Sequence, residues 1–184
     1  RFDMRAGTVD AVLAGAVGLD KTTAGVLTLG QANAYTGVTH VQGGTLVLDH
    51  AQVLAASPLL LDDTAGAGVR LLRDVTVLAL AGGGAAGGGV DLGSAVLHVA
   101  DNGTASDFAG VLRGSGGLHK AGGGSLTLSG ENTYTGTTTV SDGSLVLGAD
   151  QRLSDASRLV VQGGTLDLGG FAQTLAGVQL AGGM

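Results

Sequence analysis

The sequence predicts an all-β protein, a parallel β-helix in which short strands stack coil upon coil. Three observations lead to this prediction. Glycine supplies 36 of the 184 residues, and many glycines stand just before short apolar runs, as at strands entered through tight turns. Those runs alternate apolar and polar residues, which is the period of a half-buried strand. The sequence also resembles itself at a spacing of 99 residues.

The composition indicates a folded chain with a narrow core. Hydrophobic residues make up 44% of the chain, which argues against disorder, but only three Phe, two Tyr and no Trp are present to fill a wide core. A single glutamate, Glu131, and two lysines, Lys21 and Lys120, leave no i,i+4 charge pairing of the kind found on surface helices. Helices are therefore not expected, and a single proline without a Gly-X-Y period excludes collagen.

The repeat sets the size of one coil. Residues 11–48 align with residues 110–147 without a gap, and each copy contains "LTL" and, 19 residues later, "LVL". A strand in such a unit buries its apolar face by stacking on the equivalent strand of the next coil, about 4.8 Å away. At roughly 20–25 residues per coil, we expect about eight coils.

Expected strands follow one another through the whole chain, so we predict one continuous β-helix over residues 1–184 with no domain boundary. In the repeat copies they lie at 27–29, 36–41 and 46–48, and at 126–128, 135–140 and 145–147. Between the copies they fall within 57–63, 68–72, 74–83, 89–101 and 105–114, and the segment 153–183 continues the pattern.

Both tyrosines of the chain sit in one repeated phrase, "NAYTG" at 33–37 and "NTYTG" at 132–136. Asparagine tolerates the left-handed backbone conformation, and glycine adopts it freely. We therefore expect the phrase to form a corner between strands, with Tyr35 and Tyr134 packed over it at equivalent places.

Two glycine-rich motifs are weak as ligand sites. Gly82–Gly87 satisfies G-x-G-x-x-G, but a dinucleotide site needs a helix to start there, and strand-like sequence follows instead. Gly87–Asp91 partly resembles a calcium-binding nonapeptide, which needs tandem copies to build its stacked sites. We expect Asp91 to be a solvated turn residue, and we predict no cofactor.

Four histidines, His40, His50, His98 and His119, show no spacing typical of metal ligands. Where the repeat register holds, their counterparts are not histidine: Thr139 pairs with His40, and Asp20 pairs with His119. A zinc site needs three or four converging ligands, so we expect surface imidazoles and no metal site.

Catalytic groups are also scarce. Asp62 and Asp63 are neighbours, which in a strand point to opposite faces, and no G-x-S-x-G elbow is present. We predict no catalytic residue; the alternative, a β-helix hydrolase or lyase, would draw on Asp62, Asp63, Asp91 and Asp101. The net charge of −6 and the scattered arginines give no basic stripe for nucleic acid.

Residues 108–148, "FAGVLRGSGGLHKAGGGSLTLSGENTYTGTTTVSDGSLVLG", resemble the passenger-associated transport repeat of Gram-negative autotransporters. The copy at 11–48 resembles it with departures, among them Ala24 in place of a glycine and His40 within the threonine run. The resemblance implies a right-handed parallel β-helix that passes through the periplasm and an outer-membrane barrel to the cell surface. The absence of cysteine suits such a passage, and an export signal is expected outside this sequence.

The resemblance implies a non-enzymatic stalk that assists secretion and folding of the passenger and presents an effector region. The expected partner is the protein's own C-terminal outer-membrane barrel, outside this sequence. The alternative is an adhesion module, in which flat polar faces mediate self-association, biofilm formation or host attachment.

Overall fold

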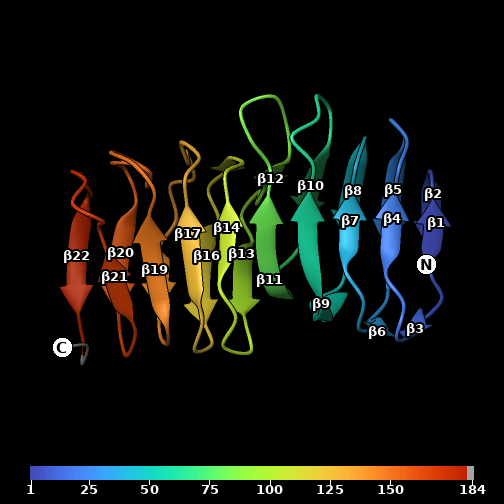
Figure 1. Cartoon of the computed structure of the whole chain (residues 1–184), viewed down its shortest axis with the longest axis horizontal. Helices are drawn as coiled ribbons and strands as arrows, with labels where there is room; N and C mark the ends of the chain where they lie inside the picture. The colour runs from blue at the N-terminus through green and yellow to red at the C-terminus, as the bar shows by residue number, and fades with distance from the viewer. Residues whose placement is uncertain (182–184) are drawn as a thin grey trace.

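A computed structural model describes residues 1–181, and every regular element in that range is a β-strand. The strands lie side by side across the long axis of a rod, with the N-terminus at one end and the last described strand at the other (Figure 1). Within this range there is no helix of the length and apolarity needed to cross a membrane.

All strand pairs in the fold are parallel, and they form three sheets. The largest sheet contains β1 (Phe2–Met4), β4 (Leu19–Lys21), β7 (Thr39–Val41), β9 (Leu54–Leu61), β11 (Val75–Gly82), β13 (Val96–Ala100), β14 (Ser106–Phe108), β16 (Gly117–Ala121), β17 (Ser125–Leu128), β18 (Thr138–Val140), β19 (Ser144–Leu147), β20 (Arg158–Val161), β21 (Thr165–Asp167) and β22 (Gly177–Leu180). The second contains β2 (Gly7–Val9), β5 (Val26–Leu29), β8 (Thr45–Leu48), β10 (Gly68–Leu71), β12 (Gly89–Asp91) and β15 (Leu112–Arg113). The third pairs β3 (Ala14–Gly15) with β6 (Ala34–Tyr35).

The chain is a parallel β-helix, as predicted, with about nine turns rather than about eight. Each strand pairs with the strand one coil further along: Leu19 lies beside Thr39, and Thr39 lies beside Leu59. The coils differ in length, since Phe2 pairs with Leu19 but Gly82 pairs with Phe108. Many coils lie at or below the lower end of the expected range, as where Leu19 pairs with Thr39 and Leu126 pairs with Leu145, so the same chain length makes one more turn.

The core is a set of stacked aliphatic side chains inside the coils. Alternate residues of each strand point inward, so that Leu27, Leu46 and Val69 form one buried ladder. The three largest apolar side chains in it are Tyr35, Tyr134 and Phe108, all at most 1% exposed. The core is narrow, as the composition predicts, because most positions hold Leu or Val.

The strands stay in line along the rod except at β9 and β11, which are eight residues long. The C-terminal half of β9 pairs with β7, whereas Val75 and Val77, in the N-terminal half of β11, pair with β13. The end of β11, Gly82, pairs with β14 instead. The ladder that begins at Leu19 therefore continues into β14 and β17, where it meets Leu126, the repeat equivalent of Leu27. Equivalent strands of the two repeat copies therefore lie on different faces of the β-helix.

Candidate functional site

The repeated Asn-x-Tyr phrase forms corners that tie three coils together. Asn33 Oδ1 accepts a hydrogen bond from the amide of Leu13, and its Nδ2 donates to the carbonyl of Val53. Asn132 does the same between the amide of Leu112 and the carbonyl of Arg152, at 2.8 Å each. Each asparagine thereby satisfies backbone groups of the coil before and the coil after its own.

The expectation that the corner asparagines adopt the left-handed backbone conformation is wrong. Among the described residues, Gln151 is the one non-glycine with positive φ. The asparagines keep an ordinary backbone conformation because their side chains, and not their φ angles, hold the corner. Gly37 and Gly136 are needed for another reason: a Cβ atom there would lie 2.4 Å from the Gly18 nitrogen and 2.2 Å from the Gly116 oxygen.

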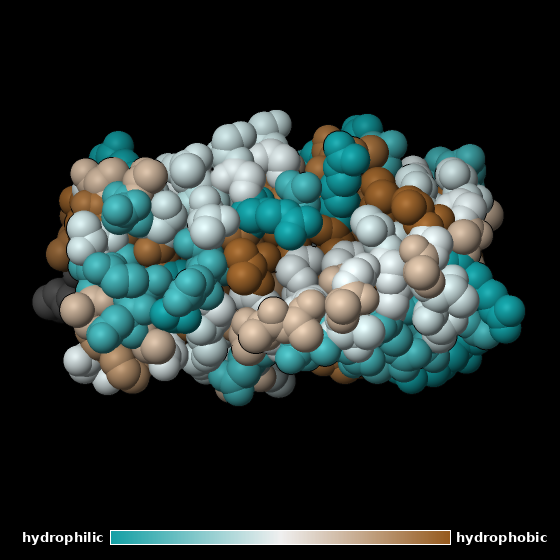
Figure 2. Space-filling model, turned by 90° about the horizontal axis from the view of Figure 1, so that it is seen from above, coloured by the Kyte–Doolittle hydropathy of each residue, from teal (hydrophilic) through white to brown (hydrophobic). Residues whose placement is uncertain are grey.

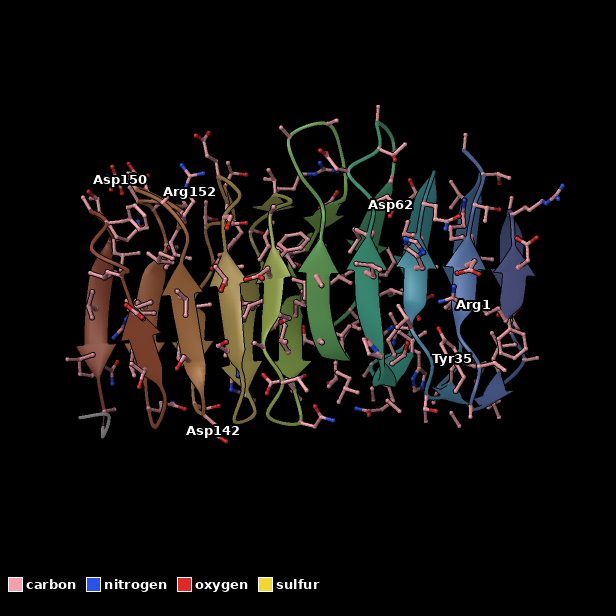
Figure 3. The ribbon with its side chains drawn as sticks, viewed as in Figure 1. Arg1, Tyr35, Asp62, Asp142, Asp150 and Arg152 are labelled. Carbon is pink, nitrogen blue, oxygen red and sulfur yellow. The ribbon has the colours of Figure 1, made fainter. Side chains whose placement is uncertain are left out.

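The two tyrosines are buried at equivalent corners, as expected, and their hydroxyl groups bond within the core. Tyr35 Oη lies 2.6 Å from Thr39 Oγ1, and Tyr134 Oη lies 2.5 Å from Thr138 Oγ1. Burial raises the pKa of Tyr35 to about 12 and raises the pKa of Tyr134 further. Both rings therefore serve the core, and Figure 3 shows Tyr35 in the N-terminal half of the rod.

Two buried lysines lie at equivalent positions in the repeat, and both are fully inaccessible to solvent. Lys120 Nζ lies 2.6 Å from Asp101 Oδ2, and both side chains are at most 1% exposed. Lys21 has carbonyl partners instead, those of Thr23 and Gly43. Burial lowers the pKa of the Lys21 ammonium group.

Of the four carboxylates that the hydrolase alternative would use, Asp101 has the most donors bonded to it, namely Lys120 and the amides of Gly103 and Gly124. Burial alone would raise its pKa, but the hydrogen bond from Lys120 and the amides of Gly103 and Gly124 lower it below the usual value. An ionised carboxylate held by three donors is suited to structure and not to proton transfer.

The other three aspartates have separate partners. Asp62 Oδ1 lies 2.6 Å from His40 Nε2 (Asp62 is labelled in Figure 3). Asp63 Oδ1 accepts hydrogen bonds from the amides of Ala86 and Gly87, as a turn residue would. The sequence predicted that Asp91 is a turn residue, but it is the last residue of β12. Its side chain faces outward, and its Oδ2 lies 4.0 Å from Arg113 Nε.

The glycine-rich segment 82–89 carries no helix start. Gly82 ends β11, the residues after it form a loop, and β12 begins at Gly89. Gly82, Gly83 and Gly88 have positive φ angles between 68° and 84°. The segment is a loop between two strands, which is the outcome that the strand-like sequence after it predicted.

Stacking brings two histidines together that sequence spacing did not connect. His98 and His119 are register partners on β13 and β16, and their Nδ1 atoms lie 2.9 Å apart. His119 Nε2 also lies 2.7 Å from Ser141 Oγ. Burial, and then the charge of His98, lower the pKa of His119. The coil length, 21 residues here, is the signal that would have found the pair.

Across residues 1–181, no three histidine, aspartate or glutamate side chains converge as ligands for a metal ion. The repeated residues Lys21, Asn33 and Tyr35 all face the interior or a corner. These three repeated residues thus bond to backbone groups or pack in the core.

Comparisons with known proteins agree with this geometry. The passenger-associated transport repeat matches residues 19–48 and 118–147. The chain is 37% identical over 138 residues to "Adhesin BmaC autotransporter" of Brucella suis biovar 1 (strain 1330); the match covers 67% of this chain and 4% of that protein. No solved structure matches the chain significantly. The chain is an autotransporter passenger sequence that carries two passenger-associated transport repeats.

Proposed function

We propose that the 184 residues act as one continuous, non-enzymatic stretch of β-helix in the stalk of a passenger on the surface of a Gram-negative cell. The stalk assists secretion by folding outside the cell, and it presents an effector region of a longer protein. Its partner during export is that protein's own C-terminal outer-membrane barrel. The proposal rests on one observation: the residues that define both repeats are bonded to the neighbouring coils.

The inward position of these residues supports a role in folding. Each corner asparagine joins the coil before it to the coil after it, so a coil that has just formed offers bonding groups to the next one. A chain that emerges from a pore can therefore fold coil by coil. The stability gained by coils folded outside the cell would prevent the chain from slipping back through the pore.

Deletion of one coil in register tests the secretion role. Removal of residues 19–38 from the full-length protein joins Gly18 to Thr39, which takes the place of Leu19 in the stack. The matched control removes residues 75–96, outside the repeats, so that Leu97 takes the place of Val75. We expect surface display, measured by antibody labelling of intact cells, to fall at least fivefold for the repeat deletion and to stay within twofold for the control. Unchanged display of the 19–38 deletion would refute the secretion role.

The adhesive alternative is favoured by the relative that is named an adhesin autotransporter. In that case this chain contributes to cell–cell aggregation, biofilm formation or host attachment. Beads coated with the 184-residue chain would then clump or bind host cells, and sedimentation would show association with rising concentration. Monodisperse chain and bare-bead levels of attachment would count against it.

A further inference from the structure

The outer face of the second sheet carries a groove in the middle of the rod. Its volume is about 550 Å³, and it lies over β8, β10 and β12. The lining residues are Val26, Thr45, Val47, the segment 66–70, Ala86, Gly87, Gly89, Asp91 and Arg113. Three of the lining residues, Val26, Thr45 and Val47, belong to the first repeat copy, and no aromatic side chain is among the described residues that line the groove.

Register explains why this face is hollow. Thr45, Gly68 and Gly89 are successive neighbours across the strands, so that two side chains are missing from the row. The segments 62–67 and 83–88 connect β9 to β10 and β11 to β12, and Figure 1 shows loops projecting there. Asp63 Oδ1 fixes the second loop by accepting hydrogen bonds from the amides of Ala86 and Gly87. In Figure 2, viewed from the side of these loops, apolar patches lie exposed among polar residues near the middle of the rod.

A second row on the same face is charged. Arg70, Asp91 and Arg113 are successive register partners, so the Cα atoms of the two arginines stand two strand spacings apart, about 10 Å. Arg70 forms no hydrogen bond or ion pair with any described residue, and Arg113 reaches Asp91 only at 4.0 Å. Asp91 Oδ1 is occupied by the amide of Gly93. The groove thus has a net positive charge in a chain whose net charge is −6.

We propose that this groove binds a linear acidic polysaccharide, with anionic groups on alternate sugars meeting Arg70 and Arg113. Guanidinium groups bind carboxylates through two parallel hydrogen bonds. The glycine floor admits a pyranose chain close to the backbone, and Val26, which is 54% exposed, offers apolar contact to a ring face. Without an aromatic platform, a neutral sugar has too little to hold it there.

Two other classes of partner fit the groove less well. An extended peptide adds to a sheet through a free strand edge, but the floor here is the face of strands already paired on both sides. Nucleic acid takes more phosphate contacts than two arginines supply. The proposal deepens the adhesive alternative above and rests on it for its biological use, but the binding itself is a property of this chain alone.

The test is isothermal titration of the 184-residue chain at low salt with three probes: hyaluronan oligosaccharides, which carry carboxylates only, heparin oligosaccharides, which add sulfates, and neutral chitin oligosaccharides. We expect the two acidic probes to bind and the neutral one not to bind. R70Q combined with R113Q should weaken binding at least tenfold. R158Q, which removes an arginine outside the groove, is the matched control and should change it less than twofold.

A gain of affinity separates the site from general effects of charge or folding. D91N removes the one negative charge between the arginines, and its side-chain oxygen can still accept the Gly93 amide. We expect tighter binding by about threefold, which a misfolded variant could not give. Binding of heparin alone would assign sulfate as the recognised group. Absence of binding to both acidic probes, or equal weakening by R158Q, would overturn the proposal, whereas the coil-deletion experiment on secretion would be unaffected.

Discussion

Two lysines at equivalent positions of the repeat, Lys21 and Lys120, differ in their bonding partners. Lys120 pairs with the buried carboxylate of Asp101 in the turn after β13. Met4 is the register partner of Lys21, and the position two residues later, which corresponds to Asp101, holds Ala6. The same lysine is thus an ion-pair partner in one copy and a donor to carbonyl groups in the other.

This difference predicts unequal costs for the same substitution. Lys120→Met leaves Asp101 buried without its counter-charge and should lower the free energy of unfolding by about 3–5 kcal/mol. Lys21→Met leaves only two carbonyl groups without a donor and should cost about 1–2 kcal/mol. Urea denaturation of both variants measures the difference. Equal losses would mean that Asp101 contributes nothing beyond a neutral acceptor.

The histidine pair predicts a dependence of stability on pH. Because the pKa of His119 is lowered in the folded state, the unfolded chain takes up a proton first, at its usual pKa of 6.5. The stabilisation is complete above about pH 6.5 and is lost as the pH falls through the lowered pKa. We expect urea midpoints to fall between pH 7.5 and pH 5. The fall should be smaller in His98→Gln, which removes the neighbouring charge, and unchanged in His50→Gln; an unchanged fall in His98→Gln would contradict the coupling.

At the scale of the element, the corner asparagine replaces the ladder hydrogen bonds that a strand would provide. Asn132→Ala leaves the Leu112 amide without a partner and leaves the Arg152 carbonyl with only the backbone amide of residue 132, at 3.3 Å, and an unsatisfied buried group costs about 1–3 kcal/mol. We expect a loss of about 2 kcal/mol or more in unfolding free energy by urea denaturation. The control is Asn102→Ala at an exposed turn, which should stay within about 0.5 kcal/mol. Similar losses in both would refute the bridging role.

The strands themselves could be predicted from sequence because two-residue alternation and the repeat act locally. Leu27-Thr28-Leu29 and Leu46-Val47-Leu48 form β5 and β8 where the alternation placed them. The lateral neighbours on the outer face could not be predicted, since they depend on the length of each coil. Register partners lie 17 residues apart at Phe2 and Leu19 but 26 apart at Gly82 and Phe108. For the same reason, the row from Arg70 to Arg113 appears in the sequence only as scattered arginines.

At the scale of the whole molecule, equivalent strands of the two repeats lie on different faces of the β-helix, and this limits the roles that the duplication can have. The ladder that starts at Leu19 reaches Leu126 and not Leu118, so equivalent residues of the two copies do not lie in line along the rod. A ligand lying along one face would therefore not meet the same motif twice. The duplication supplies coils that fold alike, and the groove forms where the first repeat copy meets the diverged coils, which carry the loops and both arginines.

The β-helix also predicts how stability is distributed along the rod. Each coil contacts only its neighbours, so a coil at an end has half the stacking of one in the middle. The burial agrees with this: every residue of β13 and β16 is buried or half-buried, whereas β2 and β22 are largely exposed. We expect hydrogen exchange of the 184-residue chain, followed by mass spectrometry, to be slowest in β11, β13 and β16 and fastest in β1, β2 and β22. Protection that is uniform from end to end would instead mean that the coils open as one cooperative unit, and the nearest-neighbour account of the stalk would be wrong.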